Sequence, residues 1–522
     1  MNLGEQEKPK AGQSMSDSKL TNFTRLAKVI LDKRPVVKDV FGRYGEQTVF
    51  NYIKDYVSTP SLVVNKKRQI DFINIVRDET SRRLGASVAS SVAEQLEKYY
   101  YASTIDHYGP VYHPWVLNFN LISSQVYLES EDPILKNIIS LSCANVSLNN
   151  IYFPRGFSFS SNVAGSLKSH RLSLLPSNSH GSSVFGFRAY LSSEVDKIIR
   201  VVRELFSSGE ISLEIKNKLE KLINDVYGSK ELFDFKYFTE QITRTNYYLW
   251  NKILGERNKK INFVYLEQEL ITTELLIKHH LNNNTILSKI LFNERGREIL
   301  EKYFDGSSKA FSLSNKTGTF LFWGLRKNGG VNRSQLWARD GKLVSDDGFF
   351  SIPLEPEEIV EALRNGSIVP SVLLVFLTIC FYYGVTCFGG LGQINYLPEM
   401  KDLYVNLLKE IGDDESKDVF YNLSTDKLGG EMIVALAENE AGESAMATSS
   451  DFLLYGDEKT WDTFVKQAKN ITLKESIIPN FPLDYPVIFS LAEREPELQT
   501  VTREDITKII DLDKKIKPCI KI

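Results

Sequence analysis

Cysteine is scarce in this chain, which has four cysteines among 522 residues. None of them belongs to a Cys-x-x-Cys pair, and four are too few for a disulfide framework in a chain of this length. Low cysteine usage is typical of a reducing compartment, so we predict a cytoplasmic protein. The four are Cys143, Cys380, Cys387 and Cys519.

The sequence also lacks an excess of either charge, with 63 Lys and Arg against 66 Asp and Glu and a net charge of -3. This balance argues against a nucleic-acid partner, because such proteins usually carry a basic excess. The hydrophobic fraction of 42% and the charged fraction of 25% are ordinary for a globular protein. The length predicts several domains of roughly 100–200 residues each.

We predict neither a signal peptide at the N-terminus nor a membrane span in the most apolar stretch of the sequence. Residues 1–19 are polar, and we predict a disordered tail there. The stretch 365–398 has no charged residue, but its apolar core 371–383 makes a helix of only about 20 Å. A bilayer core needs about 30 Å, so we predict a buried helix and a following buried strand, and no membrane partner.

Alternation of helices with short apolar strands predicts an α/β fold with a Rossmann-like core. We assign residues 20–191 and 305–412 to two halves of this core. Between them, residues 192–304 contain no proline and show helical periodicity, which predicts a long coiled-coil-like insertion and a homodimer formed through it. Residues 413–522 follow an acidic linker and are predicted to form a C-terminal α/β extension.

The common catalytic and nucleotide-binding motifs are absent. The sequence has no GxGxxG after a strand, no GxxxxGK[ST], no HExxH and no GxSxG. These absences weaken the interpretation as a dinucleotide dehydrogenase, a P-loop protein, a zincin or a common α/β-hydrolase. The sequence therefore identifies no cofactor.

Histidine is rare, and four of the six histidines fall between residues 107 and 180. His107 and His113 flank a Gly-Pro turn, which can bring two imidazoles to one ligand or place a general base beside a substrate. Three interpretations stay open: turn histidines bonded to the backbone, a polar small-molecule site, or a metal site. The metal candidates are Asp106, His107, His113 and His180.

Two further features point to a ligand. Arg155 lies between a proline and a glycine at a strand end, where a guanidinium often binds a carboxylate or phosphate. The turn Gly389–Gln393 has three glycines in four residues, which permits close approach of a backbone to a ligand or simply a tight connection. Ligands of open α/β sheets bind at the carboxyl ends of strands, so we expect the turns at His107 and Gly390 to meet at one sheet edge.

Two stretches resemble the cysteine-adding enzymes of bacillithiol biosynthesis. The first stretch has Thr104, His107, Gly109 and Pro110 in the same order as the family. The second stretch has an apolar helix after Pro370-Ser371, followed by the glycine-rich turn Gly389–Gln393. In that second stretch the matching residues are Gly389, Gly390, Gln393 and Tyr396.

This resemblance implies a Rossmann-like core, a coiled-coil insertion used in dimerisation, and a reaction that joins cysteine to a glucosamine–malate acceptor. The chain departs from the family at Ile105-Asp106, and it has residues 140–145 in place of the family's acidic stretch. These differences indicate a different substrate or a lost activity.

We therefore predict a cytoplasmic biosynthetic enzyme that acts on a small polar metabolite, by a ligase-like reaction or one that adds a thiol or an amine. The alternatives are a non-catalytic binding or scaffold protein and a metal-dependent hydrolase. His107 is the predicted general base or polar anchor, and Arg155 is the predicted carboxylate clamp. The remaining predicted substrate-binding residues are Asp106, His113, Asn118, Gly389, Gly390, Gln393 and Tyr396.

Overall fold

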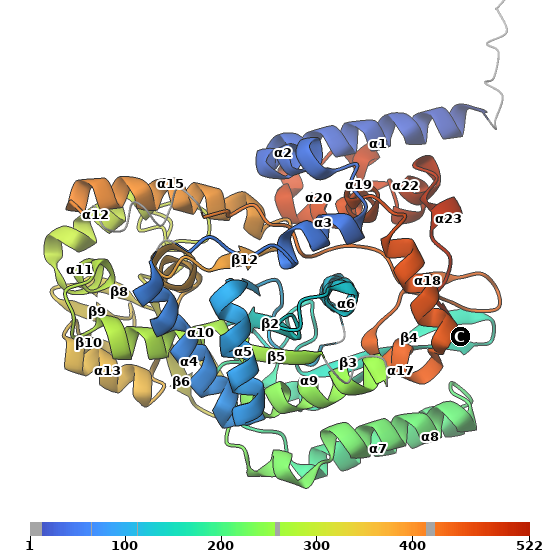
Figure 1. Cartoon of the computed structure of the whole chain (residues 1–522), viewed down its shortest axis with the longest axis horizontal. Helices are drawn as coiled ribbons and strands as arrows, with labels where there is room; N and C mark the ends of the chain where they lie inside the picture. The colour runs from blue at the N-terminus through green and yellow to red at the C-terminus, as the bar shows by residue number, and fades with distance from the viewer. Residues whose placement is uncertain (1–12, 64, 112, 256–260, 414–422) are drawn as a thin grey trace, which may run out of the picture.

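A parallel four-stranded sheet forms the centre of the computed structural model, which describes residues 13–63, 65–111, 113–255, 261–413 and 423–522. Its spatial order is β12-β1-β2-β5. Ser103 at the end of β1 pairs with Phe388 on one side and with Ser140 on the other. The chain is therefore a mixed α/β protein (Figure 1). The strands are β1 (Tyr101–Ser103), β2 (Asn137–Ser142), β5 (Asn262–Glu267) and β12 (Thr386–Phe388).

Both faces of this sheet are covered by helices, because its strands are apolar on both sides. In β5, Phe263 and Tyr265 belong to one hydrophobic core, and Val264 and Leu266 belong to the other. This alternation is the period of a strand. The first core contains α3 (Val49–Val57), α6 (Pro114–Glu129) and α9 (Phe238–Leu254). The second contains α4 (Lys66–Leu84), α5 (Ala86–Lys98), α10 (Gln268–Leu275) and α14 (Val372–Phe376).

The order of the strands reverses beside β1. From β1 the chain passes through α6 to β2 and later adds β5 on the same side, whereas β12 returns to the opposite side of β1. In open α/β sheets, ligands bind outside the carboxyl ends of the strands at such a reversal. This rule directs attention to the loops that follow β1, β2, β5 and β12.

The predicted helical insertion over residues 192–304 is not confirmed. Its first part is a hairpin of α7 (Ser192–Ser207) and α8 (Leu213–Leu222), at the lower edge of Figure 1. However, β5 lies within the same range and pairs along its whole length with β2. All six residues of β5, four of them apolar, pair with β2 in a ladder of backbone hydrogen bonds, so this stretch belongs to the core.

The apolar stretch near residue 380 lies in the interior, as its sequence predicts. It forms α14, a π-helical turn over Leu377–Tyr382 and then β12, and Leu374 and Ile379 are almost fully buried. Within the described ranges, no helix is both long and apolar enough to cross a membrane.

The N-terminal prediction is wrong in part. Residues 13–19, assigned to a disordered tail, begin α1 (Gln13–Lys33), while residues 1–12 lie outside the described residues. Residues 13–19 contain no proline or glycine, and the Lys19 ammonium lies 2.6 Å from the Asp505 carboxylate. A C-terminal contact thus anchors the first turns of this helix.

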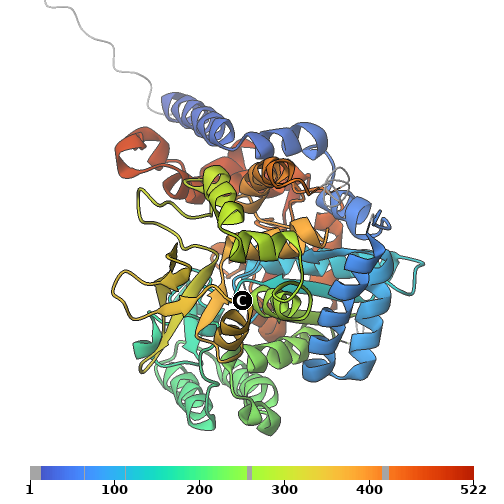
Figure 2. The same cartoon turned by 90° about the vertical axis from the view of Figure 1, so that its left-hand side faces the viewer.

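Smaller antiparallel sheets and peripheral helices surround the core (Figure 2). The strands are β3 (Gly156–Val163) with β4 (Ser166–Ser173); β6 (Phe322–Lys327), β7 (Val331–Gln335) and β11 (Ile368–Pro370); β8 (Trp337–Arg339), β9 (Lys342–Val344) and β10 (Ser351–Pro353). The other helices before residue 413 are α2 (Pro35–Tyr44), α11 (Ile286–Phe292), α12 (Glu294–Phe304), α13 (Pro356–Arg364) and α15 (Gln393–Ile411).

The C-terminal residues 423–522 pack against the N-terminal helices α1 and α2 (Figure 1). They carry a three-stranded sheet of β13 (Leu436–Glu438), β14 (Ser444–Met446) and β15 (Ile520–Lys521). Their helices are α17 (Ser449–Tyr455), α18 (Glu458–Ala468), α19 (Leu473–Ile477), α20 (Phe481–Ile488), α21 (Pro496–Gln499), α22 (Arg503–Ile509) and α23 (Leu512–Lys515).

Candidate functional site

The loop after β1 lies at the carboxyl edge of the sheet, between the ends of β12 and β2. The Thr104 amide donates to the Phe388 carbonyl at 2.9 Å, and the Cys143 amide donates to the Asp106 carbonyl at 2.9 Å. These bonds extend the strand pairing beyond the regular sheet. The turns at His107 and Gly389 therefore follow neighbouring parallel strands and lie at one sheet edge, as expected.

Asn150 holds the imidazole of His107. Its Oδ1 atom lies 2.9 Å from Nδ1 of His107 and also accepts a hydrogen bond of 3.1 Å from the Tyr152 amide. The amide donor identifies this atom as the oxygen, so Nδ1 of His107 carries the proton and Nε2 keeps its lone pair. Burial lowers the pKa of His107, which keeps the ring neutral near pH 7.

His113 caps the N-terminus of α6 and lies beside the same aromatic ring as His107. Its Nδ1 atom accepts from the Trp115 amide at 3.4 Å. The ring centroids of His107 and His113 lie 4.6 and 4.5 Å from that of Tyr152. Burial, followed by the charges of His107, Arg503 and Arg171, lowers the pKa of His113 to about 3. The Gly-Pro turn thus brings both imidazoles to Tyr152.

Asp106 is a buried carboxyl group with one hydroxyl donor. The Tyr265 hydroxyl donates to its Oδ2 atom at 2.8 Å. Burial raises the pKa of Asp106 to about 7, against the opposing effects of the Tyr265 bond and of the His107 amide. A carboxyl group with this pKa exchanges its proton near neutral pH, which suits acid–base chemistry.

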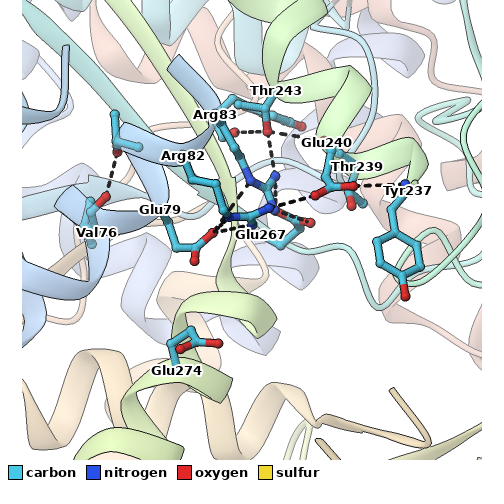
Figure 3. Close-up of polar contacts among 12 residues, drawn as sticks. Val76, Glu79, Arg82, Arg83, Tyr237, Thr239, Glu240, Thr243, Glu267 and Glu274 are labelled. Carbon is cyan, nitrogen blue, oxygen red and sulfur yellow. Dashed lines mark hydrogen bonds and ion pairs between the residues drawn. The ribbon is translucent and has the colours of Figure 1, made fainter. Parts of the chain in front are cut away.

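A buried ion pair between Arg83 and Glu267 lies next to the loop that follows β1 (Figure 3). Arg83 at the end of α4 lies 2.6 Å from a carboxylate oxygen of Glu267, at the end of β5, and both side chains are almost fully buried. Arg83 also donates to the Thr243 hydroxyl at 2.8 Å, and the hydroxyls of Thr243 and Tyr108 lie 2.7 Å apart. The network therefore connects α4, α9 and β5 to the loop that carries His107.

Beside Arg83, the neighbouring Arg82 lies 2.6 Å from Glu79 and 2.8 Å from Glu240 (Figure 3). These pairs are nearer the surface than the Arg83–Glu267 pair, and they tie α4 to the start of α9. Both guanidinium groups are paired with carboxylates, so neither arginine of this cluster is free for an anionic ligand (Figure 3).

Cys143 and Glu269 form a second pair at the sheet edge. The Cys143 thiol donates to Glu269 at 3.2 Å, and the amides of Ala144 and Asn145 donate to the same carboxylate at 2.9 and 3.0 Å. Burial and the Glu269 charge raise the pKa of Cys143, so the thiol is protonated near pH 7. Glu269 thus closes the loop after β2 with three hydrogen bonds.

The predicted role of Gly389 and Gly390 as ligand-binding residues is not supported by their surroundings. The chain's own segment 427–431 fills the space there: the Gly429 amide donates to the Gly389 carbonyl at 2.9 Å. A Cβ atom on Gly390 would lie 3.1 Å from the Glu431 carboxyl. The glycines therefore permit close approach of another backbone, which is the tight-connection alternative. Gly390 faces Glu431, and the His107 ring contacts Asn150 and Tyr152 instead.

Gln393, Asn118 and Tyr396 are also held by internal contacts. Gln393 donates to the Thr104 hydroxyl at 2.6 Å and so ties α15 to the end of β1. Asn118 is fully buried and donates to the Met432 carbonyl at 2.8 Å, which makes it a connection to the C-terminal segment. Tyr396 packs against Phe376, with ring centroids 6.0 Å apart.

The candidate metal set does not converge. Across the described ranges, no group of three or more His, Cys, Asp or Glu side chains is placed to hold a metal ion. Asp106 binds Tyr265, and His107 binds Asn150, while the His180 backbone carbonyl accepts from the Ser147 hydroxyl. The four predicted ligands Asp106, His107, His113 and His180 therefore form no metal site in the described part of the chain.

Arg155 lies beside an aromatic ring, together with a second arginine. The guanidinium carbons of Arg155 and Arg171 lie 5.2 and 5.3 Å from the centroid of the Phe153 ring. Burial, followed by the charge of Arg171, lowers the pKa of Arg155. These arginines come from the start of β3 and from β4, and Phe153 directly follows Tyr152 of the histidine cluster.

Sequence reasoning missed Asn150, Tyr152, Tyr265 and the C-terminal Arg503. The pair Asn149-Asn150 before Pro154 is a turn signal that could have suggested Asn150. Tyr265 and Arg503 carry no local signal, because Tyr265 bonds to Asp106, and the Arg503 charge acts on His113, only through the tertiary fold. No protein-family model matches the chain, and no curated protein matches its sequence.

Proposed function

We propose that this chain is an enzyme with a Rossmann-like α/β core that acts on a small polar metabolite, with His107 as the general base. The carrying observation is the bond between Asn150 and His107, which leaves the Nε2 lone pair unprotonated. The lowered pKa of His107 supports this role, since a base must be neutral before it accepts a proton. His107 as a residue is only partly buried, which fits a group that meets a substrate.

In the proposed step, Nε2 of His107 removes a proton from the attacking thiol or amine while the nucleophile's electron pair forms a bond to the acceptor carbon. The bond between that carbon and its leaving group breaks, and the leaving group departs with the bonding electron pair. The imidazolium faces the neutral amide oxygen of Asn150, which accepts from Nδ1 in both protonation states. The proton then returns to the leaving group or to water. The resemblance to enzymes that add cysteine supports a ligase-like or thiol- or amine-adding reaction in the cytoplasm. Proton transfer of this kind contributes about 10²–10⁴-fold to a rate.

The test uses the purified full chain and a metabolite extract from cytoplasm. Mass spectrometry follows which metabolites are retained and which are consumed with time. We expect His107→Gln to reduce consumption by about 10²-fold or more while the melting temperature changes little. His279→Gln, in a helix away from the loop, is the matched control.

Two results would count against this function. Consumption that is unchanged in His107→Gln would remove His107 as the base. A metabolite that is retained but never consumed by the wild-type chain would favour the alternative of a non-catalytic binding protein.

A further inference from the structure

A small cavity lies beside β12, the strand at one edge of the central sheet. Its volume is about 240 Å³, and Thr386 of β12 and Tyr101 of β1 both line it. These two residues pair at the amino ends of their parallel strands. His107, in contrast, follows the carboxyl end of β1. The cavity is therefore separate from the loop that carries the proposed base.

Aromatic and apolar residues make up much of the cavity wall. Leu62, Val63 and Leu423 contribute aliphatic side chains, and the rings of Tyr101 and Phe388 contact each other with centroids 5.5 Å apart. Pockets for small molecules usually have such walls, together with a few polar groups that fix the orientation of the ligand. The aromatic residues among the described lining are Tyr56, Tyr100, Tyr101, Tyr383 and Phe388.

Lys427 brings a positive charge to this wall, and its backbone is held on two sides. Its carbonyl accepts from the Gly389 amide at 2.8 Å, and the next amide, of Leu428, donates to the Tyr52 hydroxyl at 3.0 Å. The Lys427 ammonium lies 3.6 Å from the centroid of the Tyr56 ring, and both residues line the cavity. The ammonium therefore lies at the cavity wall, on a residue whose main chain is fixed by β12 and α3.

The Lys427 ammonium donates no hydrogen bond to any acceptor in the described part of the chain. Among the described carboxylates, only Asp426 lies within 4.0 Å, and at 4.0 Å it is beyond hydrogen-bond distance. Asp426 is held instead by Arg43, at 2.5 Å. The face of the Tyr56 ring carries only a partial negative charge. Burial lowers the pKa of Lys427, as expected of an ammonium that has lost part of its water.

The other polar groups of the wall suit a ligand with oxygen acceptors. Ser61 Oγ accepts from the Tyr100 amide at 2.9 Å, which leaves the hydroxyl proton of Ser61 for another acceptor. Oδ1 of Asn65 accepts from the Arg68 amide at 3.0 Å, so the Nδ2 side of this amide group is its donor side. Asp55 is the one carboxylate among the described lining, and it is exposed, so water solvates it. The charge that lies away from solvent is therefore positive.

We propose that this cavity binds a small aromatic carboxylate, with the carboxylate on Lys427 and the ring among the tyrosines. An ammonium and a carboxylate form a strong, charge-assisted hydrogen bond, and aromatic rings pack well edge to face or offset. A volume of about 240 Å³ lies just below the usual range for drug-sized ligands, which limits the ligand to roughly one ring. This site is additional to the proposed function and does not depend on it.

The test follows binding of 4-fluorobenzoate to the full chain by fluorine NMR at pH 7. We expect saturable binding to the wild-type chain, and Lys427→Met should weaken it about 10-fold or more, because the carboxylate loses its counter-charge. Lys427→Arg keeps the charge and should retain most of the affinity. Lys469→Met is the matched control, since that ammonium also lies on a ring, 4.7 Å from the Phe50 centroid, but pairs with Glu129 at 2.8 Å. It should leave the affinity unchanged.

A second ligand and a second variant separate charge from shape. The neutral 4-fluorobenzyl alcohol has the same ring and should bind about 10-fold or more weakly than the acid. Thr386→Phe places a ring in the cavity and should abolish binding while Lys427 is intact. This variant decides the location even where Lys427→Met fails to fold, which its melting temperature would show.

Four outcomes would overturn the carboxylate site: no saturable binding, unchanged affinity in Lys427→Met, unchanged affinity in Thr386→Phe, or equal affinity for the alcohol and the acid. The role of His107 is tested separately, because His107→Gln should bind 4-fluorobenzoate as the wild type does. Loss of binding in His107→Gln would place the ligand at the histidine loop and would also overturn this site. If binding behaves as expected but His107→Gln keeps full turnover, the proposed function fails while the carboxylate site stands.

Discussion

The Oδ1 atom of Asn150 lies 2.9 Å from Nδ1 of His107, and the Tyr152 amide donates to the same oxygen. This arrangement determines which nitrogen of His107 holds the proton. The hydrogen bond to Asn150 raises the pKa of His107, but a neutral amide does so less than a carboxylate would, and burial has the larger, opposite effect. The ring therefore keeps the lowered pKa that burial gives it.

Replacement of Asn150 by aspartate should raise the pKa of His107, because a carboxylate stabilises the imidazolium. We expect an increase of about 1 unit or more. NMR titration of the imidazole protons measures it, with the His107 signal assigned from its loss in His107→Gln. Asn217→Asp adds the same charge on the exposed face of α8 and should leave this pKa unchanged. An unchanged pKa in Asn150→Asp would contradict the contact.

Asp106 should make stability depend on pH. Its folded pKa of about 7 lies above the ordinary value of 3.8, so its neutral form stabilises the fold. This contribution is complete below about pH 4, and it is lost at roughly 1.4 kcal/mol per pH unit as the pH rises through about 7. The side chain of Asp106→Asn cannot ionise. The melting temperature of this variant, relative to that of the wild type, should therefore increase as the pH rises from about 4 to about 7. A constant difference would show that Asp106 is ionised in the fold. Asp55→Asn is the exposed control.

The buried pair of Arg83 and Glu267 should be sensitive to loss of one partner. Glu267→Gln leaves the buried Arg83 guanidinium with only the longer carboxylate contact to Glu79, at 3.8 Å, and we expect a loss of about 3–5 kcal/mol in stability. The double variant Arg83→Met with Glu267→Met should recover part of this loss. Lys514→Gln breaks an exposed pair with Asp511 and should cost under about 1 kcal/mol. Thermal and urea unfolding measure all three, and equal losses for the two single variants would contradict the buried character of the pair.

The α7–α8 hairpin exposes apolar side chains at which the homodimer predicted from the sequence can be tested. Val201 is 40% exposed, Leu213 is 56% exposed, and both lie on the hairpin. We expect the full chain to sediment as a dimer and Val201→Glu with Leu213→Glu to sediment as a monomer, because charges at an apolar interface lose their hydration. A wild-type chain that is monomeric at all concentrations would exclude this interface.

Local sequence determined the elements whose pattern is strong. The apolar run after Pro370 is long enough for a buried helix and a strand, and it forms α14, its π-helical turn and β12. Helix α6 (Pro114–Glu129) and the polar turn before it also follow from local signals, since Pro114 suits the first turn of a helix. These local signals identified His107, His113 and Arg155 as candidate site residues. All three lie beside the rings of Tyr152 or Phe153.

Tertiary structure alone decided the rest. Residues 262–267 lie among helices in the sequence but become β5, because β2 offers them a complete hydrogen-bonded partner. The glycines at 389 and 390 suit a ligand or a backbone equally well, and only the fold placed segment 427–431 there. Arg503 is distant in sequence from His113, and no local pattern encodes their proximity. Local patterns specify which residues become helix or strand, whereas a site built from separate segments depends on contacts that form only when those segments pack together.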